Sequence, residues 1–287
     1  MTNKRLLIVL GPTAVGKSDY AISRAKEFSC PIVNCDSRQI FREMNIGVAR
    51  PTPEQLASVK HYLIANHSVT EHYTAGLFEL EAMALLEELF RTYDTLVATG
   101  GSGFYIDALC DGLDDFPPAD LQIRESLMSR LENEGIESLQ EQLKQIDPES
   151  YASLDLSNRQ RMVRALEVTL ATGRKFSSYK SASAKSRPFE IEKIGLRRDR
   201  EQLYDRIDRR VEQMMADGLE AEARSLLPYR DRPALNTVGY KELFGFFDGG
   251  YPLEEAVRLI KRNSRHYAKK QMTYWRRDSS INWIDLD

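Results

Sequence analysis

The sequence predicts an α/β fold in which a parallel sheet is flanked by helices and interrupted by an all-helical insertion. Apolar segments at 6–10, 31–36 and 95–99 alternate with helical patterns, and this alternation is typical of a parallel sheet. From 119 to 173 only helical patterns occur. We therefore expect one α/β core into which a separate helical unit is inserted.

The first apolar segment leads directly into a glycine-rich loop. The loop consists of Gly11, Pro12, Thr13, Ala14, Val15, Gly16, Lys17 and Ser18. A strand, such a loop and a helix in this order form a P-loop, whose backbone N–H groups point inward at a phosphate chain. Lys17 and the helix N-terminus add positive charge, and the Ser18 hydroxyl can ligate Mg²⁺. The core is thus expected to be P-loop NTPase-like, with a site for a diphosphate or triphosphate that need not be ATP.

Polar groups follow the next two strands at the same edge of the sheet. Ligands of open α/β sheets bind outside the carboxyl ends of the strands, so Asp36 is expected near the molecule in the P-loop. Asp36 is either a base or Mg²⁺ partner there, or an N-cap for 37–41, and its position alone favours neither. The turn at 100–103, Gly-Gly-Ser-Gly, either admits a ligand close to the backbone or is a flexible connection.

Helical patterns also occur between these strands. Thr52 is expected to cap a helix that begins at Pro53. His61 and His67 follow, and we interpret both as structural groups rather than ligands. A helical pattern runs from 75 to 91, and the apolar side chains on one side of it are Leu77, Leu80, Ala84, Leu85 and Leu89.

The insertion is predicted at 116–188, between core segments 1–115 and 189–287. Its helical patterns lie at 121–131, 136–146 and 158–172. Gly173 is expected to end the last of these helices, and a Ser-rich loop follows. The last helix carries Arg159, Gln160, Arg161 and Arg164, a cluster that is either a solvated face or a contact for nucleic-acid phosphates.

A strand pattern at 190–196 returns the chain to the core, and the last long helix spans 253–277. This helix has no acid from 258 to 277, and its basic face contains Arg258, Arg262, Arg265 and Lys269. A face of one sign with Tyr267 and Tyr274 nearby favours an anionic partner such as RNA over a solvated surface. Val257, Ile260 and the two tyrosines are expected to face the core.

Composition excludes several classes of protein. The net charge of −3 gives no global signal for nucleic acid, although a local basic patch would suffice. Cys30, Cys35 and Cys110 form no CxxC pair, which argues against zinc and disulfides and fits a reducing compartment. No apolar run approaches the roughly twenty residues of a membrane span. We therefore expect a cytoplasmic protein without a membrane partner, and nothing implies a protein partner or more than a monomer.

Taken together, the motifs resemble those of the bacterial tRNA dimethylallyltransferases, also called tRNA isopentenyltransferases. The shared segments follow the family's order and lie at 11–18, 36–39, 47–53, 100–105, 159–167, 239–242 and 261–278. The Asp-Ser-Arg-Gln segment and the C-terminal Arg-Asn-Ser-Arg-His-Tyr-Ala-Lys-Lys-Gln segment are far more specific than the P-loop. Phe41, Val48, Arg50 and Ser102 depart from the usual Tyr, Thr, Lys and Thr.

The resemblance implies a reaction. The family transfers the dimethylallyl group of dimethylallyl diphosphate to N6 of the adenosine just 3′ of a tRNA anticodon, and diphosphate is released. The P-loop would then hold the diphosphate of the prenyl donor rather than a nucleotide, with Mg²⁺ as cofactor. The insertion would clamp the anticodon stem-loop, and the basic C-terminal helix would contact phosphates.

The resemblance also implies roles for particular residues. Asp36 would be the general base, and Thr13, Lys17 and Arg206 would stabilise the departing diphosphate, with Mg²⁺ at Ser18. The residues expected to contact tRNA are Asp36, Ser37, Arg38, Gln39, Ser102, Arg124, Gln160, Arg161, Met162, Val163, Arg164, Arg262 and Arg265.

Three alternatives stay open from the residues alone. A small-molecule or nucleotide kinase would bind ATP in the P-loop and use Asp36 to activate an acceptor hydroxyl. Prenyl transfer to free AMP or ADP would leave the insertion and the basic helix without an obvious role. A non-catalytic RNA-binding switch would use a nucleotide only for control.

Overall fold

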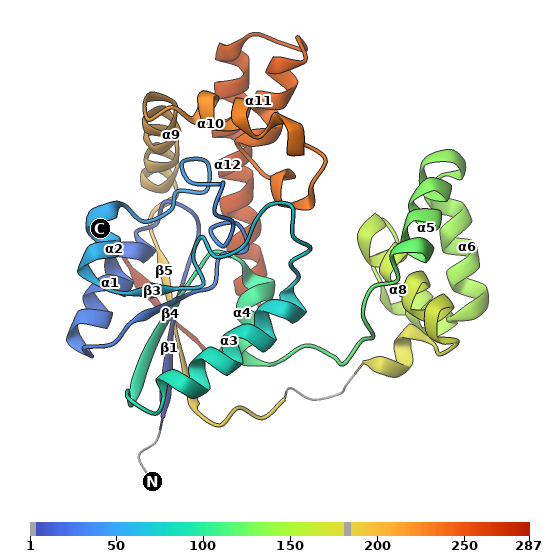
Figure 1. The fold of residues 1–287 in the computed structure, drawn as a ribbon, viewed down its shortest axis with the longest axis horizontal. Helices are drawn as coiled ribbons and strands as arrows, with labels where there is room; N and C mark the ends of the chain where they lie inside the picture. Colours follow the sequence, from blue (N-terminus) through green and yellow to red (C-terminus); the bar gives the residue numbers. More distant parts are fainter. Residues whose placement is uncertain (1–3, 181–184) are drawn as a thin grey trace. The chain divides into compact units, whose positions relative to one another are not determined.

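A six-stranded parallel sheet forms the framework of the computed structural model, which describes residues 4–180 and 185–287 (Figure 1). The strands are β1 (Arg5–Leu10), β2 (Ile32–Asn34), β3 (His61–Tyr62), β4 (Thr95–Thr99), β5 (Glu190–Arg197) and β6 (Ile281–Asp285). Their order in the sheet is β3-β2-β4-β1-β5-β6, and every neighbouring pair is parallel. The predicted α/β class is confirmed.

The chain divides into two compact units. One consists of Met1–Gly112 and Ser186–Asp287 and contains the sheet, and the other is Leu113–Lys185, close to the predicted insertion at 116–188. Within the predicted Ser-rich loop, residues 181–184 lie outside the described residues. None of the helices in the described part of the chain is long and apolar enough to cross a membrane.

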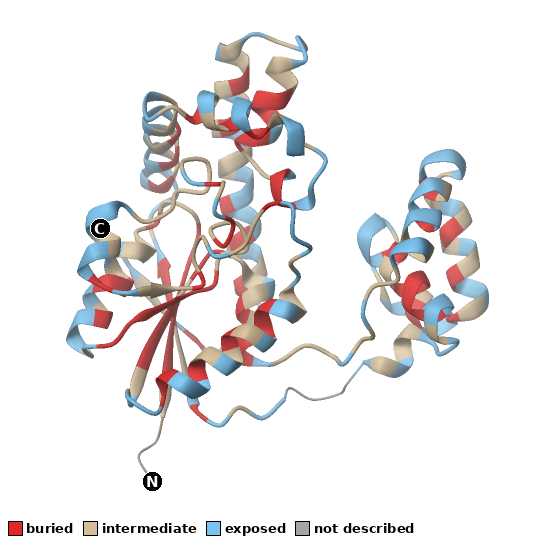
Figure 2. Ribbon diagram, in the orientation of Figure 1, coloured by how far each residue is buried: buried red, intermediate tan, exposed pale blue. Residues whose placement is uncertain are grey.

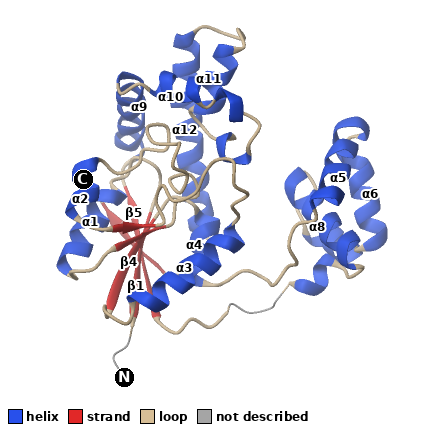
Figure 3. Cartoon of the chain, viewed as in Figure 1, coloured by secondary structure: helices blue, strands red, loops and turns tan. Residues whose placement is uncertain are grey.

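The smaller unit is helical, as Figure 3 shows. Its helices are α5 (Leu121–Glu134), α6 (Ile136–Ile146), α7 (Pro148–Ser153), α8 (Arg159–Thr172) and the 3₁₀ turn Phe176–Tyr179. Asp147 caps α7 and also accepts hydrogen bonds from the backbone and hydroxyl of Ser177 at 2.9 and 2.8 Å. This link joins the end of the unit to its middle, and Gly173 ends α8 in the left-handed conformation, as expected.

The larger unit surrounds its sheet with helices from both ends of the sequence. They are α1 (Lys17–Glu27), α2 (Pro53–Ser58), α3 (Ala75–Leu89), α4 (Gly103–Cys110), α9 (Arg200–Ala216), α10 (Leu219–Ser225), α11 (Tyr240–Phe247) and α12 (Leu253–Trp275). Figure 2 shows the strands as the most buried elements, and residues 6–10 of β1 are at most 1% exposed. A strand buried on both faces requires the continuous apolar sequence that predicted it.

Strand order brings three loops to one edge of the sheet. β4 lies between β1 and β2, so the loops that follow these strands are neighbours. The amide of Cys35 donates to the Thr99 carbonyl at 2.7 Å, and the Gly100 amide donates to the Val9 carbonyl at 3.4 Å. A Cβ on Gly100 would lie 2.4 Å from the Cys35 carbonyl, so only glycine fits there. The P-loop, Asp36 and the glycine-rich turn are therefore adjacent.

Two predicted helix faces were wrong in detail. In α3 the buried residues include Phe78, Ala82 and Leu86, whereas Leu80 is 71% exposed. Apolar residues occur all round this helix, so periodicity alone did not identify the face that packs. In α12, Tyr267 is 42% exposed and lines a cavity instead of the core.

Candidate active site

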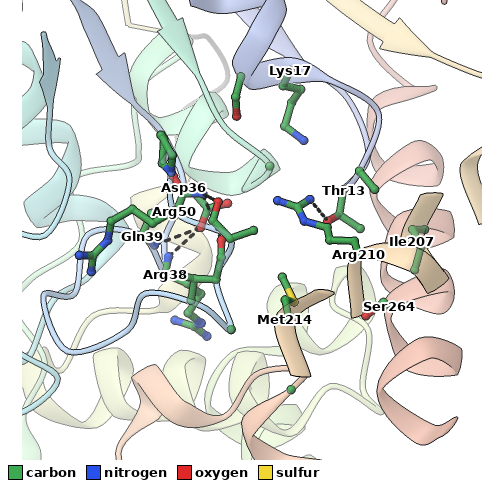
Figure 4. A pocket seen from close by; sticks show the side chains of 18 of the residues that line it. Thr13, Lys17, Asp36, Arg38, Gln39, Arg50, Ile207, Arg210, Met214 and Ser264 are labelled. Carbon is green, nitrogen blue, oxygen red and sulfur yellow. Dashed lines mark hydrogen bonds between the residues drawn. The ribbon is translucent and has the colours of Figure 1, made fainter. Parts of the chain in front are cut away.

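A cavity of about 660 Å³ opens at the carboxyl edge of the sheet. Its walls come from the P-loop, the segment after β2, residues 47–52, α9 and α12. Figure 4 shows Lys17 and Thr13 on one side of it and Asp36, Arg38 and Gln39 on another, with Arg210 between them. Segments distant in the sequence thus enclose one polar site.

The P-loop has the backbone expected of a phosphate site. Gly16 precedes α1 with φ 113°, and Ala14 has φ 64°, so the loop curls back before the helix begins. The Lys17 ammonium donates to the carbonyls of Gly11 and Pro12 at 2.8 and 2.9 Å. Burial, with a smaller effect of the nearby Arg210, lowers the pKa of Lys17 to about 7, although Asp36 opposes the shift.

Two arginines of α9 reach the same loop. Arg206 Nε donates to the Ala14 carbonyl at 2.9 Å, and Arg210 Nη1 donates to Thr13 Oγ1 at 3.3 Å. The two are four residues apart, so they lie on one face of the helix. Burial lowers the pKa of Arg210. Arg206 was predicted here and Arg210 was not.

Gln271 of α12 joins the P-loop to the glycine-rich turn. Its Oε1 accepts from the Thr13 amide at 2.9 Å, and its Nε2 donates to the Gly101 carbonyl at 2.7 Å. The residue is only 6% exposed. Sequence analysis assigned it no role, although it lies within the specific C-terminal segment.

Asp36 uses its two carboxylate oxygens differently. One oxygen, Oδ1, accepts from the amides of Arg38 and Gln39 at 2.9 and 3.3 Å, so the residue caps a turn rather than a helix. The other, Oδ2, would lie 3.4 Å from a Cβ on Gly101, and Lys17 Nζ would lie 3.9 Å from the same point. Asp36 also lines the cavity, so one oxygen is held and the other faces the site.

The neighbours of Asp36 are fixed by hydrogen bonds. Ser102 Oγ accepts from the Ser37 amide at 2.9 Å and donates to Ser37 Oγ at 3.0 Å. Gln39 Nε2 donates to the carbonyls of Val48 and Ala49 at 3.1 and 3.0 Å. Arg38 lines the cavity. Ser37, Gln39 and Ser102 thus shape the wall in which Arg38 and Asp36 face inward.

The residues predicted on the insertion fall into three groups. Met162 and Val163 are 0% exposed and belong to the unit's own core, so their side chains are not available for the tRNA contacts expected of these residues. Arg124 and Arg164 both pair with the buried carboxylate of Glu167, at 2.9 and 2.5 Å. The exposed members of the cluster are Arg159, Gln160 and Arg161.

The basic face of α12 is partly neutralised by acids that the linear sequence does not place beside it. Arg265 pairs with Asp208 at 2.7 Å, and Lys261 pairs with Glu212, both from α9. Arg262 is exposed and contacts only Asn263, at 3.3 Å, in the hydrogen bonds described for it. The helix is therefore less strongly positive than predicted. Of the two arginines expected to contact tRNA, Arg262 is exposed and Arg265 is paired, and Lys269 of the same face is also exposed.

The fold and the site define a P-loop α/β protein in which a carboxylate lines the same cavity as the P-loop. The sequence profile of the IPP transferases matches residues 39–278. The chain therefore belongs to the IPP transferase family, and the family predicted from its motifs is confirmed.

Curated relatives and solved structures agree with this membership. The chain is 52% identical to tRNA dimethylallyltransferase 1 of Porphyromonas gingivalis, with 97% of this chain and 93% of the relative covered. It is 48% identical to tRNA dimethylallyltransferase 1 of Phocaeicola vulgatus, over 98% of this chain and 94% of the relative. The structure resembles the tRNA isopentenylpyrophosphate transferase of Bacillus halodurans with a TM-score of 0.72 and 34% identity, covering 99% and 91% of the two chains.

Proposed function

We propose that the protein transfers the dimethylallyl group of dimethylallyl diphosphate to N6 of the adenosine just 3′ of a tRNA anticodon. The observation that carries this proposal is the single cavity in which Lys17, Arg206 and Arg210 surround the P-loop while Asp36 faces the same space. The names of the similar proteins support the choice of tRNA as acceptor. A purely phosphate-binding role would account for Asp36 only as the cap of its turn and would give Oδ2 no function.

The departing diphosphate would be stabilised at the P-loop. As the bond between the allylic carbon and oxygen breaks, negative charge develops on the diphosphate, and preformed donors aimed at it lower the barrier. Backbone N–H groups of the P-loop other than those of Thr13 and Val15, which donate to Gln271 and Pro12, would supply these donors together with Lys17 and the two α9 arginines. Arg210 would reach the diphosphate beside Thr13, whose hydroxyl it already contacts at 3.3 Å.

A Mg²⁺ ion fits the oxygen ligands present. Ser18 in the first turn of α1 lines the cavity together with Asp36 and Asp19, and hydroxyl and carboxylate oxygens are the ligands that Mg²⁺ prefers. We propose Ser18 as the protein ligand, directly or through water. When bound there, the ion would neutralise charge on the diphosphate.

The acceptor amine would be oriented and deprotonated by Asp36. An exocyclic adenine amine is a weak nucleophile, so alignment with the reacting carbon contributes as much as the base does. The N6–C bond forms as the C–O bond breaks, one N6 proton passes to Asp36 Oδ2, and diphosphate leaves. Because Oδ1 is held by two amides, the carboxylate keeps its orientation through this step.

The remaining contacts of the tRNA are proposed on the cavity wall, on α8 of the insertion and on α12. Arg38, with Asp36 and Gln39, would hold the base that leaves its stack, which an anticodon loop allows at low cost because it is not a duplex. Gln160, Arg161 and Arg262 are exposed and would contact phosphates.

Prenyl incorporation tests the proposal against its rivals. The protein is incubated with Mg²⁺ and dimethylallyl diphosphate labelled in the prenyl group, and with unmodified tRNA, AMP or ADP as acceptor. In the absence of ATP, we expect the label to be incorporated into tRNA only. Label in AMP or ADP would instead identify a free-nucleotide prenyltransferase. Phosphoryl transfer in a parallel reaction that contains ATP and no prenyl donor would identify a kinase.

A further inference from the structure

One wall of the cavity is an irregular loop that is held from outside the site. Gly47, Val48, Ala49 and Arg50 line the cavity, and the segment contains no strand or helix. Ala49 has φ 49°, a conformation that non-glycine residues seldom adopt. Such a wall needs fixed contacts to keep one shape.

Glu222 of α10 supplies the largest set of these contacts. Its carboxylate accepts from three successive amides, those of Asn45, Ile46 and Gly47, at 3.1, 2.8 and 3.0 Å. It also accepts from the Tyr240 hydroxyl at 2.6 Å. Successive N–H groups that converge on one anion form a concave site, and hydrogen bonds to a charged acceptor are stronger than neutral ones. Glu222 itself does not line the cavity.

Tyr240 also holds the loop, because its ring packs directly against Gly47. It is 0% exposed, and a Cβ on Gly47 would lie 2.6 Å from its ring, so the loop lies directly against this side chain. Burial, with a smaller effect of Glu222, raises the pKa of Tyr240, so the phenol stays protonated and can donate. Glu222 and Tyr240 therefore fix the position of the loop together.

The same loop is tied to the acceptor side of the site at its other face. Gln39 Nε2 donates to the carbonyls of Val48 and Ala49, and Gln39 belongs to the segment that begins with Asp36. Arg50 Nη2 donates to the Phe41 carbonyl at 2.8 Å. A shift of the amides at 45–47 would therefore move the wall beside Asp36, while the P-loop has separate supports in Gln271 and α9.

We propose that Glu222 is a positioning residue that sets the acceptor wall of the cavity and so controls tRNA binding, without touching substrate. The acceptor named here rests on the proposed function. A glutamine at this position keeps the shape but has one oxygen and one amide donor in place of two acceptor oxygens, so it cannot accept all four hydrogen bonds.

The test compares Glu222→Gln with Glu220→Gln. Glu220 lies on the same helix and pairs only with the exposed Arg224 among the contacts described for it, so its variant is the matched control. We measure hydrogen exchange of the amides at 45–47, the Kd for unmodified tRNA, and kcat and KM for both substrates. In Glu222→Gln we expect faster exchange, and a Kd and KM for tRNA raised about tenfold, with donor KM within about twofold. Tyr240→Phe, which removes one hydrogen bond, should show the same pattern more weakly and covers the case that Glu222→Gln does not fold.

Three results would overturn the positioning role. They are unchanged exchange at 45–47, faster exchange with unchanged tRNA binding, and an equal loss for donor and tRNA that follows a lowered melting temperature. Wild-type protein that binds tRNA without prenylating it would refute the proposed function. The comparison of Glu222→Gln with Glu220→Gln by hydrogen exchange and by the Kd for tRNA would still decide the positioning role. Wild-type protein that binds no tRNA would refute both.

Discussion

The lowered pKa of Lys17 predicts that binding of the prenyl donor weakens as pH rises. A diphosphate favours the charged ammonium, so above pH 7, where the free lysine is mostly neutral, each binding event takes up one proton. With a pKa of about 7, the protonated fraction falls from roughly a quarter at pH 7.5 to roughly a hundredth at pH 9. The Kd should therefore rise roughly twentyfold over this interval, provided that Lys17 remains charged in the complex.

Calorimetry of an unreactive alkyl diphosphate with wild-type protein and fixed Mg²⁺ measures this effect. The ligand's last pKa is about 6, so its own charge barely changes over the interval. Titrations in buffers of different ionisation enthalpy count the protons taken up. The control is Lys17→Arg, whose guanidinium stays charged over this pH range. Its Kd for the diphosphate should not change between pH 7.5 and 9. A wild-type Kd that stays constant from pH 7.5 to 9, with no proton uptake, would refute the account of Lys17.

Other predictions concern α9, the insertion and α12. Arg210→Ala should lower kcat/KM for the donor about a hundredfold. Arg200→Ala, which removes an exposed side chain at the start of α9 that lies over the Tyr204 ring and outside the cavity, should leave kcat/KM unchanged. Equal kcat/KM values for the two variants would show that Arg210 does not act in the site. Met162→Ala should destabilise the helical insertion by about 2 to 5 kcal/mol, measured by hydrogen exchange in α8, and exchange at the wild-type rate would contradict its core position. Arg262→Ala should reduce the magnitude of the slope of log K against log salt for tRNA binding by roughly one, and an unaltered slope would show that this arginine contacts no phosphate.

The core of the fold follows from local patterns in the sequence. Continuous apolar runs are typical of strands in a parallel sheet covered on both faces, and the run at 6–10 forms one of the two central strands. The rule that ligands bind at the carboxyl ends of strands placed Asp36 correctly, because β2 and β1 flank β4. The P-loop backbone was also predictable, because its glycines, the strand before it and the helix after it are contiguous in the sequence.

The parts of the site that depend on distant helices were not predictable in this way. Arg210, Gln271 and Glu222 reach the site or its wall from α9, α12 and α10, and no local pattern gives the packing of these helices. Met162 was assigned to RNA because it lies within a family motif, and a motif does not distinguish a core position from a surface one. Arg265 was expected to contact tRNA, and its pairing with Asp208 could not be inferred locally because Asp208 is on another helix.

Mass spectrometry of nucleosides from treated tRNA tests the central claim most directly. Unmodified tRNA is incubated with the protein, Mg²⁺ and dimethylallyl diphosphate in the absence of ATP, and Asp36→Asn is run in parallel. The account predicts N6-dimethylallyladenosine at the position 3′ of the anticodon with the wild type, and a yield lower by a factor of about a hundred or more with the variant, at unchanged tRNA binding. No prenylated adenosine with the wild type, or equal yields from both proteins, would contradict it.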